Sequence, residues 1–278
     1  MEAFPRVARR IYEEARQSQR LIAGRSLEEL KQIALRQEGV IQTQFGSVAA
    51  DSEPMSRSAP HTRNSIDHPF GEAEEALADQ AAAVLSRERV IALDTIISDS
   101  RDGVTARFLI PEPYAQLAYG LKLLFDYPAP RTVEDPTYTI IYFTDEAFEF
   151  NKKKKLVDKD IDVRLWMGSR RGEQVKICRN TIYLGEGKKG VFQFEDWRVK
   201  AIDKSGIFLH TGARRDLVWV YDPETERPEL KEIVTAISGL TATGKTTTLC
   251  RKFAKLPRES SEMIGDDGGT LAFDGSYA

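Results

Sequence analysis

Apolar residues recur along the chain in two patterns, and the first predicts helices and strands in alternation. Spacings of three and four residues predict helices over residues 6–23, 27–38, 72–86 and 111–125. Ser26 and Glu29 form the capping-box pair at the start of the second of these helices. Apolar and β-branched runs predict strands over residues 89–93, 106–110 and 138–143. This alternation is typical of an α/β domain.

After about residue 155 the second pattern takes over, with short apolar runs between turns and charged loops. Strands are expected over residues 174–178, 180–184, 191–194, 206–210 and 217–221. Short strands in series indicate a mixed or antiparallel sheet. Proline and turn residues near 215–230 predict a boundary between two parts of the chain.

The composition excludes several classes of protein. The 278 residues are 41% hydrophobic and carry a formal net charge of −3, which argues against a disordered chain and against a generally basic nucleic-acid binder. No apolar run approaches the roughly 20 residues of a membrane helix, and the first residues lack a hydrophobic signal core. Cys178 and Cys250 stand apart, so neither a disulfide framework nor a zinc site is indicated. We therefore expect a cytoplasmic protein.

The clearest chemical signal is a phosphate-binding pattern. Residues 239–246 fit G-x-x-x-x-G-K-[ST], with a strand-like run over 232–237 before them and a helix-compatible run over 246–253 after them. In such a loop backbone N–H groups surround phosphate oxygens, the lysine reaches the β- and γ-phosphates, and the hydroxyl coordinates Mg²⁺. A chance glycine-rich turn is the alternative. The predicted nucleotide-binding residues are Gly239, Leu240, Thr241, Ala242, Thr243, Gly244, Lys245, Thr246 and Thr247.

Two aspartates follow this loop after a short apolar stretch. Asp267 is the candidate for holding a divalent metal ion, because a carboxylate at a strand end beside a phosphate loop is well placed to do so. A surface hairpin is the alternative. The fold predicted is therefore α/β. An N-terminal α/β domain with a mixed sheet, residues 1–220, precedes the start of a P-loop-containing nucleotide-binding α/β domain, residues 221–278.

Four segments of the second half occur in the order of one enzyme family's motifs. Residues 183–192 match Y-x-G-E-x-K-K-G-x-F, and residues 209–213 are similar to a metal-binding M-H-C-S-A segment. Residues 239–247 are similar to G-L-S-G-T-G-K-T-T, and residues 264–267 match I-G-D-D. Together they resemble the ATP-type phosphoenolpyruvate carboxykinases. The resemblance is strong from about residue 180 onward and weak before it.

The resemblance implies a lyase of gluconeogenesis that converts oxaloacetate and ATP into phosphoenolpyruvate, CO₂ and ADP, with Mg²⁺ and Mn²⁺. It implies that Lys189, His210 and Asp267 bind Mn²⁺, and that Tyr183 and Lys189 bind the substrate. A lysine binds a metal ion only when neutral, and nearby cations and burial favour that form. Without the resemblance, Lys189 would be read as part of a charged turn, and His210 equally well as a core histidine. The catalytic residues implied are Arg57, Lys189, Lys245 and Asp267.

Arg57 is the candidate for holding the substrate carboxylate. It lies in a segment, residues 46–71, whose serines and prolines predict a long loop that is either disordered or functional. Residues 55–59 are the nearest counterpart of the family's T-G-R-S-P segment, and an arginine fork suits carboxylate recognition. An ordinary loop arginine is the alternative.

Several positions depart from the family's pattern. Thr241 and Ala242 replace Ser and Gly, Gly268 and Gly269 replace a polar pair, and Arg214 stands where asparagine is common. These departures leave the choice of substrate open. The family continues well beyond the Asp-Asp segment, so we expect the chain to be an N-terminal fragment with an incomplete nucleotide site.

Two other functions remain open at this point. A P-loop small-molecule kinase would not depend on oxaloacetate, and a regulatory protein would bind ATP without turnover. In each case the expected partners are small molecules rather than nucleic acid or membrane, and the oligomeric state is not predicted.

Overall fold

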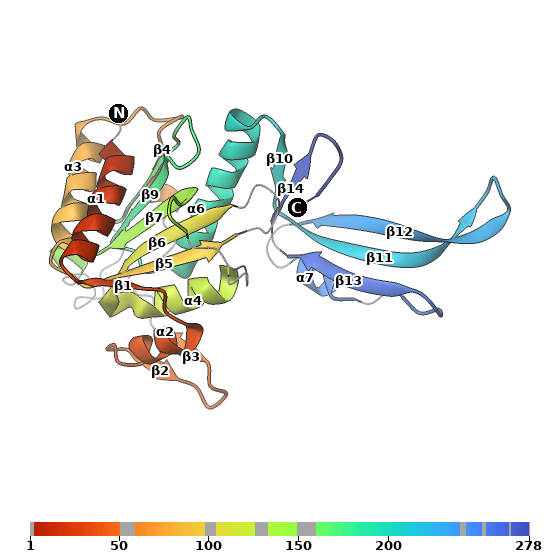
Figure 1. Cartoon of the computed structure of the whole chain (residues 1–278), viewed down its shortest axis with the longest axis horizontal. Coiled ribbons are helices and arrows are strands. Elements are labelled where there is room, and N and C mark those ends of the chain that lie inside the picture. The colour runs from red at the N-terminus through yellow and green to blue at the C-terminus, as the bar shows by residue number, and fades with distance from the viewer. Residues whose placement is uncertain are drawn as a thin grey trace. The chain divides into compact units, whose positions relative to one another are not determined.

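The computed structural model describes residues 3–50, 59–97, 104–125, 133–148, 160–239, 243–251, 254–266 and 268–277. It divides into two compact units, Met1–Phe194 and Glu195–Ala278, called unit 1 and unit 2 here. The fold is α/β with a mixed sheet, as the sequence predicted (Figure 1).

Unit 1 is built on a seven-stranded sheet of order β1-β5-β6-β7-β9-β8-β4. The central strands β6, β7 and β9 run parallel to one another, whereas β5 and β8 are antiparallel to β6 and β9. At the two edges, β1 and β4 are parallel to β5 and β8. The strands are β1 (Leu21–Ala23), β4 (Thr62–Asn64), β5 (Val90–Ile96), β6 (Thr105–Pro111), β7 (Tyr138–Phe143), β8 (Asp162–Trp166) and β9 (Gln174–Arg179).

Helices cover both faces of this sheet. In Figure 1, α1 (Ala3–Gln17) and α3 (Glu72–Leu85) lie on one face and α4 (Ala115–Phe125) on the other, where α6 (Leu184–Trp197) also packs. Successive strand residues point to opposite faces, so Phe108 joins the buried cluster with α4 and Leu109 the cluster with α1. Strands β6 and β7 are consequently buried along their whole length, as expected for strands covered on both sides.

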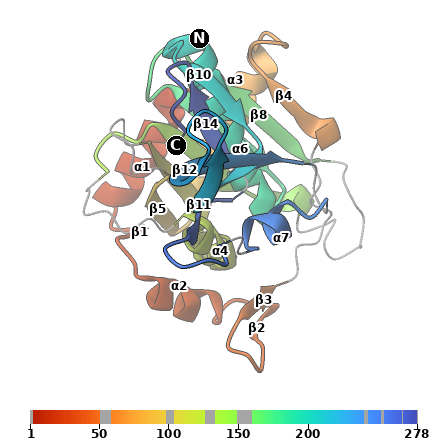
Figure 2. The ribbon, with the colours of Figure 1, turned by 90° about the vertical axis from the view of Figure 1, so that its right-hand side faces the viewer.

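A smaller layer lies beside α4. It contains α2 (Leu27–Ala34) and the hairpin of β2 (Val40–Gln42) and β3 (Val48–Ala50), which lie together in Figures 1 and 2. The predicted capping box is present, because the Glu29 N–H donates to Ser26 Oγ and the Ser26 N–H donates to Glu29 Oε2. Two 3₁₀ turns, η1 (Ala59–His61) and η2 (Glu112–Tyr114), precede β4 and α4.

Three element predictions in unit 1 need correction. The helix predicted over residues 6–23 ends at Gln17, because Leu21–Ala23 pairs with β5. The strand predicted over residues 180–184 is absent, since residues 180–183 lie outside any strand and Leu184 begins α6, and the predicted strand over residues 191–194 belongs to α6. Val191 and Phe194, one helical turn apart, both enter the core, and this burial outweighs their preference for strands.

The strands of unit 2 form a three-stranded and a two-stranded antiparallel sheet. Strand β11 (Thr211–Asp222) pairs with β12 (Arg227–Ser238) along its whole length and with β13 (Ser260–Gly265) on its other side. Strands β10 (Gly206–Leu209) and β14 (Gly269–Ala272) form a separate pair. A π-helical turn, η3 (Arg198–Ile202), precedes β10, and α7 (Lys245–Leu249) follows β12. The strands expected at 206–210 and 217–221 are thus confirmed as β10 and part of β11.

The turn residues expected to mark a boundary have a local role in unit 2. Residues 223–226 connect β11 to β12 as a hairpin turn, while the compact units divide after Phe194. The assignment of residues 1–220 and 221–278 to two functional domains stays a prediction. Across the described ranges, no helix has the length and apolar character needed to cross a membrane.

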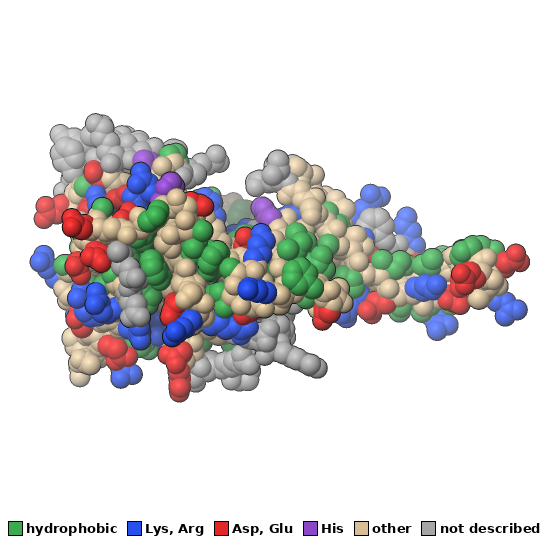
Figure 3. All heavy atoms as spheres, turned by 90° about the horizontal axis from the view of Figure 1, so that it is seen from above, with side chains coloured by type: hydrophobic (Ala, Val, Ile, Leu, Met, Phe, Trp, Pro, Cys, Tyr) green, Lys and Arg blue, Asp and Glu red, His purple; other side chains and the backbone are tan. Residues whose placement is uncertain are grey.

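Most residues of β12 are exposed. Ile233 and Val234 keep 41% and 48% of their surface accessible, and charged residues of both signs lie between the apolar ones. Figure 3 shows this mixture of hydrophobic and charged side chains along the β11–β12 hairpin. The hairpin is therefore stabilised mainly by backbone pairing and cross-strand contacts.

Candidate functional site

The phosphate-binding motif has the expected local structure. It begins directly after β12, and its lysine is the first residue of α7, so the predicted strand–loop–helix order is confirmed. Gly244 has a φ of +86°, in the left-handed region that glycine adopts at low cost. Lys245 is 8% exposed, whereas Thr246 and Thr247 are exposed. Leu240, Thr241 and Ala242 lie outside the described residues.

A hydroxyl and a carboxylate meet beside this helix. Thr246 Oγ1 donates a hydrogen bond of 2.7 Å to Asp266 Oδ2, which joins the start of α7 to the end of β13. Hydroxyl and carboxylate oxygens are ligands that Mg²⁺ accepts, so this pair fits a divalent ion. The sequence prediction named Asp267, which lies outside the described residues, and missed Asp266. The doubled aspartate was the signal that could have found both.

Across the described ranges, no group of three or more His, Cys, Asp and Glu side chains could hold a metal ion. His210 is exposed between β10 and β11, which removes the alternative of a buried core histidine. Its metal-binding role, like that of Lys189, stays a prediction.

The second motif places two predicted substrate residues together at the start of α6. Lys189 Nζ lies 5.2 Å from the centre of the Tyr183 ring. It also lies 3.0 Å from Glu186 Oε1, one helical turn earlier, and its side chain is 48% exposed. The Tyr183 ring and the Glu186 carboxylate therefore restrict the position of the Lys189 ammonium group. Arg57, the third predicted substrate residue, lies outside the described residues.

A buried ion pair joins β9 to this part of α6. The Lys176 ammonium group lies 2.9 Å from Glu186 Oε2 and donates a 2.8 Å hydrogen bond to the Glu186 carbonyl oxygen. Both side chains are almost fully buried, so each charge depends on the other for compensation. One carboxylate, that of Glu186, thus connects the sheet to Lys189.

Two neighbouring groups are held in their neutral forms. Burial raises the pKa of the Tyr142 phenol well above its ordinary value, and the nearby Cys178 and Glu186 add to the effect. Burial raises the pKa of the Cys178 thiol to about 12. Cys178 is therefore an inert core residue and not a nucleophile.

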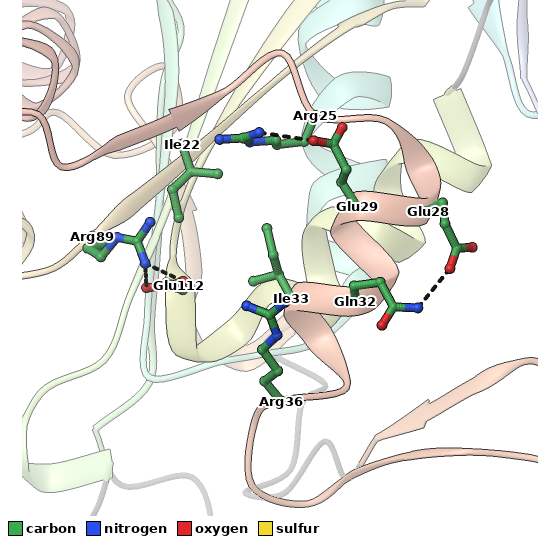
Figure 4. A pocket seen from close by; sticks show the side chains of 9 residues that line it. All are labelled: Ile22, Arg25, Glu28, Glu29, Gln32, Ile33, Arg36, Arg89 and Glu112. Carbon is green, nitrogen blue, oxygen red and sulfur yellow. Dashed lines mark hydrogen bonds and ion pairs between the residues drawn. The ribbon is translucent and has the colours of Figure 1, made fainter.

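A separate cavity of about 420 Å³ lies against α2 (Figure 4). Three arginines and three glutamates line it, so its charges balance. Two of the arginines are paired at the wall, Arg25 with Glu29 at 2.9 Å and Arg89 with Glu112 at 2.8 Å. None of the predicted site residues lines this cavity.

Comparison with protein families identifies the class to which these motifs belong. The family model for phosphoenolpyruvate carboxykinase of the ATP type matches residues 20–278. The chain therefore belongs to the ATP-type phosphoenolpyruvate carboxykinase family. The match includes the segment before residue 180, where the motif resemblance was weak. A search of curated proteins finds no significant match.

Proposed function

We propose that the chain performs the ATP-dependent carboxykinase reaction, in which oxaloacetate and ATP give phosphoenolpyruvate, CO₂ and ADP. The family match supports the general class. The observation that carries the proposal for this chain is the 2.7 Å contact of Thr246 with Asp266 beside the buried Lys245. That arrangement suits the binding of a magnesium–triphosphate group.

The chemistry has two stages. Loss of CO₂ breaks a carbon–carbon bond of oxaloacetate and leaves its electron pair in an enolate. The enolate oxygen then attacks the γ-phosphorus of ATP, and ADP departs with the electrons of the broken P–O bond. Both stages develop negative charge, so cationic groups near the enolate and the γ-phosphoryl group lower the barrier.

The proposed roles follow from the chemistry of each residue. Lys245 binds the β- and γ-phosphates, and the Thr246 hydroxyl with Asp266 holds Mg²⁺. Lys189, His210 and Asp267 hold Mn²⁺, while Tyr183 and Arg57 orient oxaloacetate. When bound, the two ions neutralise charge on the phosphoryl group and on the enolate oxygen. Glu186 and Tyr183 limit the positions that the side-chain nitrogen of Lys189 adopts.

The test is phosphoenolpyruvate formation from oxaloacetate, ATP, Mg²⁺ and Mn²⁺. Product should require both oxaloacetate and ATP. Lys245→Ala should reduce the rate by about a hundredfold or more, because it removes a charge that stabilises the transferring phosphoryl group. The matched control is Lys231→Ala, since Lys231 is an exposed lysine of β12 that pairs only loosely with Asp222 and Glu229.

The same assay separates the alternatives. ATP consumption independent of oxaloacetate would favour a kinase, and ATP binding without turnover would favour a regulatory protein. Either result would contradict the carboxykinase proposal. Equal activity of Lys245→Ala and Lys231→Ala would remove the phosphate loop from the mechanism.

A further inference from the structure

The helix that carries Lys245 is too short to be stable by itself. It has five residues, and isolated helices of that length do not persist in water. Its last carbonyl groups also lack partners within the helix. Contacts with the rest of unit 2 must therefore hold it in place.

One such contact is apolar. Leu249, at the end of α7, is 2% exposed and lies against Gly212 of β11. A Cβ atom at position 212 would come within 1.9 Å of Leu249 Cδ1, so any larger residue there would force the Leu249 side chain to move. Figure 1 shows α7 beside β11 and β13.

The other contact is a buried arginine on the same strand. Arg214 is 6% exposed, and its Nη1 donates to the carbonyl oxygens of Thr248 at 3.0 Å and Arg251 at 3.4 Å. These carbonyls belong to the last turn of α7 and the residues after it. A cation at this position also interacts favourably with the helix dipole.

The arginine is itself held by a second polar group. Arg214 Nε donates to Asp216 Oδ2 at 2.7 Å, and Ser261 Oγ of β13 donates to Asp216 Oδ1 at 2.6 Å. The Ala254 N–H in turn donates to Ser261 Oγ at 3.2 Å. Hydrogen bonds thus connect Thr248 directly, and Ala254 through Ser261, to the buried ion pair of Arg214 and Asp216.

We propose that Arg214 is a positioning residue that sets the direction of α7 and thereby places Lys245 for phosphate binding. Lys245 begins the helix, and Thr248, whose carbonyl Arg214 binds, follows three residues later. A short rigid helix transmits a displacement at its last turn directly to its first residue. A displacement of about 1 Å at such a site is costly to function. The inference rests on the proposed function only in that Lys245 contacts phosphate.

The next residue on β11 provides a matched control. Arg215 points to the other face of the strand, its side chain is 49% exposed, and its ion pairs within the described ranges are long, 3.7 Å to Glu232 and 3.9 Å to Glu262. Arg215→Gln therefore removes the same charge from the same strand without touching α7.

The first measurement is hydrogen exchange in the ligand-free 278-residue chain. The amides of Thr248 and Cys250 donate to the carbonyl oxygens of Gly244 and Thr246, so both bonds depend on the helical turn of α7 and its caps. Arg214→Gln should speed exchange in peptides covering residues 243–251 by about tenfold or more, whereas Arg215→Gln should leave it unchanged. Unchanged exchange in Arg214→Gln would overturn the proposal.

The second measurement is the affinity for Mg²⁺-ATP by calorimetry. Arg214→Gln should bind about tenfold more weakly than the wild type, Arg214→Lys should lie between them, and Arg215→Gln should match the wild type. If Arg214→Gln does not fold, Asp216→Asn replaces it, because it keeps the buried volume and weakens the same anchor.

The outcomes separate this inference from the proposed function. A wild type that binds no Mg²⁺-ATP refutes the nucleotide function, and with it the role of Arg214 in placing Lys245 for phosphate binding. A wild type that binds normally, alongside an Arg214→Gln variant of equal affinity, refutes the role of Arg214 alone.

Discussion

The sheets of the two units are stabilised in different ways. In unit 1, β6 and β7 are buried on both faces, and an apolar cluster fills the space on each side. In unit 2, most of β12 is exposed, and the buried contacts of β11 include an arginine and an aspartate. Apolar burial dominates the first unit, whereas backbone pairing and a few specific polar contacts dominate the second.

This difference shows where function is most sensitive to single residues. An apolar core tolerates changes that preserve volume, since its contacts have no directional requirement. A polar anchor such as Arg214 with Asp216 depends on geometry, and losing one partner leaves the other charge buried without compensation. The helix α7, which follows the phosphate-binding loop, is held by such a polar anchor, the pair of Arg214 and Asp216.

The largest expected difference between the units is in cysteine reactivity. Cys178 is fully buried with a pKa of about 12, whereas Cys250 is exposed at the end of α7. At pH 8 a disulfide reagent should label Cys250 at least about a thousandfold faster, because Cys178 is buried away from the reagent and the rise of its own pKa from 9.0 to about 12 lowers its thiolate fraction by that factor.

Thiol counting checks this difference. One thiol should react in the native chain and two in urea, and Cys250→Ser should abolish the fast reaction. Two fast thiols in the native chain would contradict the burial of Cys178.

The next difference concerns apolar truncations. Phe108→Ala, in the core of unit 1, should lower the free energy of unfolding by about 3–5 kcal/mol, because a cavity replaces a fully buried ring. Val234→Ala, on exposed β12, should change it by no more than about 0.5 kcal/mol. Urea denaturation of both variants makes the comparison. A large loss for Val234→Ala would show that β12 is covered in solution.

The smallest effect is the pH dependence of a helix cap in unit 1. The Ser26 N–H, then the Ser26 hydroxyl and Arg25, lower the pKa of Glu29 from 4.5 to about 2. Because the folded value lies below the unfolded one, the carboxylate stabilises α2 above about pH 4.5. That contribution is lost as the pH falls from 4.5 toward 2. Glu29→Gln should remove this part of the acid sensitivity.

The cap prediction is measured by an NMR titration of Glu29 and by unfolding at pH 7 and pH 3. Glu28→Gln is the matched control, since Glu28 accepts from Gln32 and takes no part in the capping box. A Glu29 titration near 4.5 would contradict the capping geometry.

Local patterns predicted much of the fold because the relevant interactions are local or period-dependent. The capping box at Ser26 and Glu29 involves residues three apart, and the apolar runs of β6 and β7 reflect burial on both faces. The prediction was wrong at residues 191–194, where Val191 and Phe194 suggested a strand. Their burial in the core of unit 1 stabilises a helix there instead.

The sequence by itself determined the family, the phosphate-binding motif and the residue types of the site, because these depend on spacing along the chain. Only the tertiary structure revealed Asp266 beside Thr246, Lys176 beneath Glu186, and Arg214 at the end of α7. Each of these contacts joins residues on different elements. Spacing along the chain does not encode such a contact, because the pairing register and packing of the elements create it.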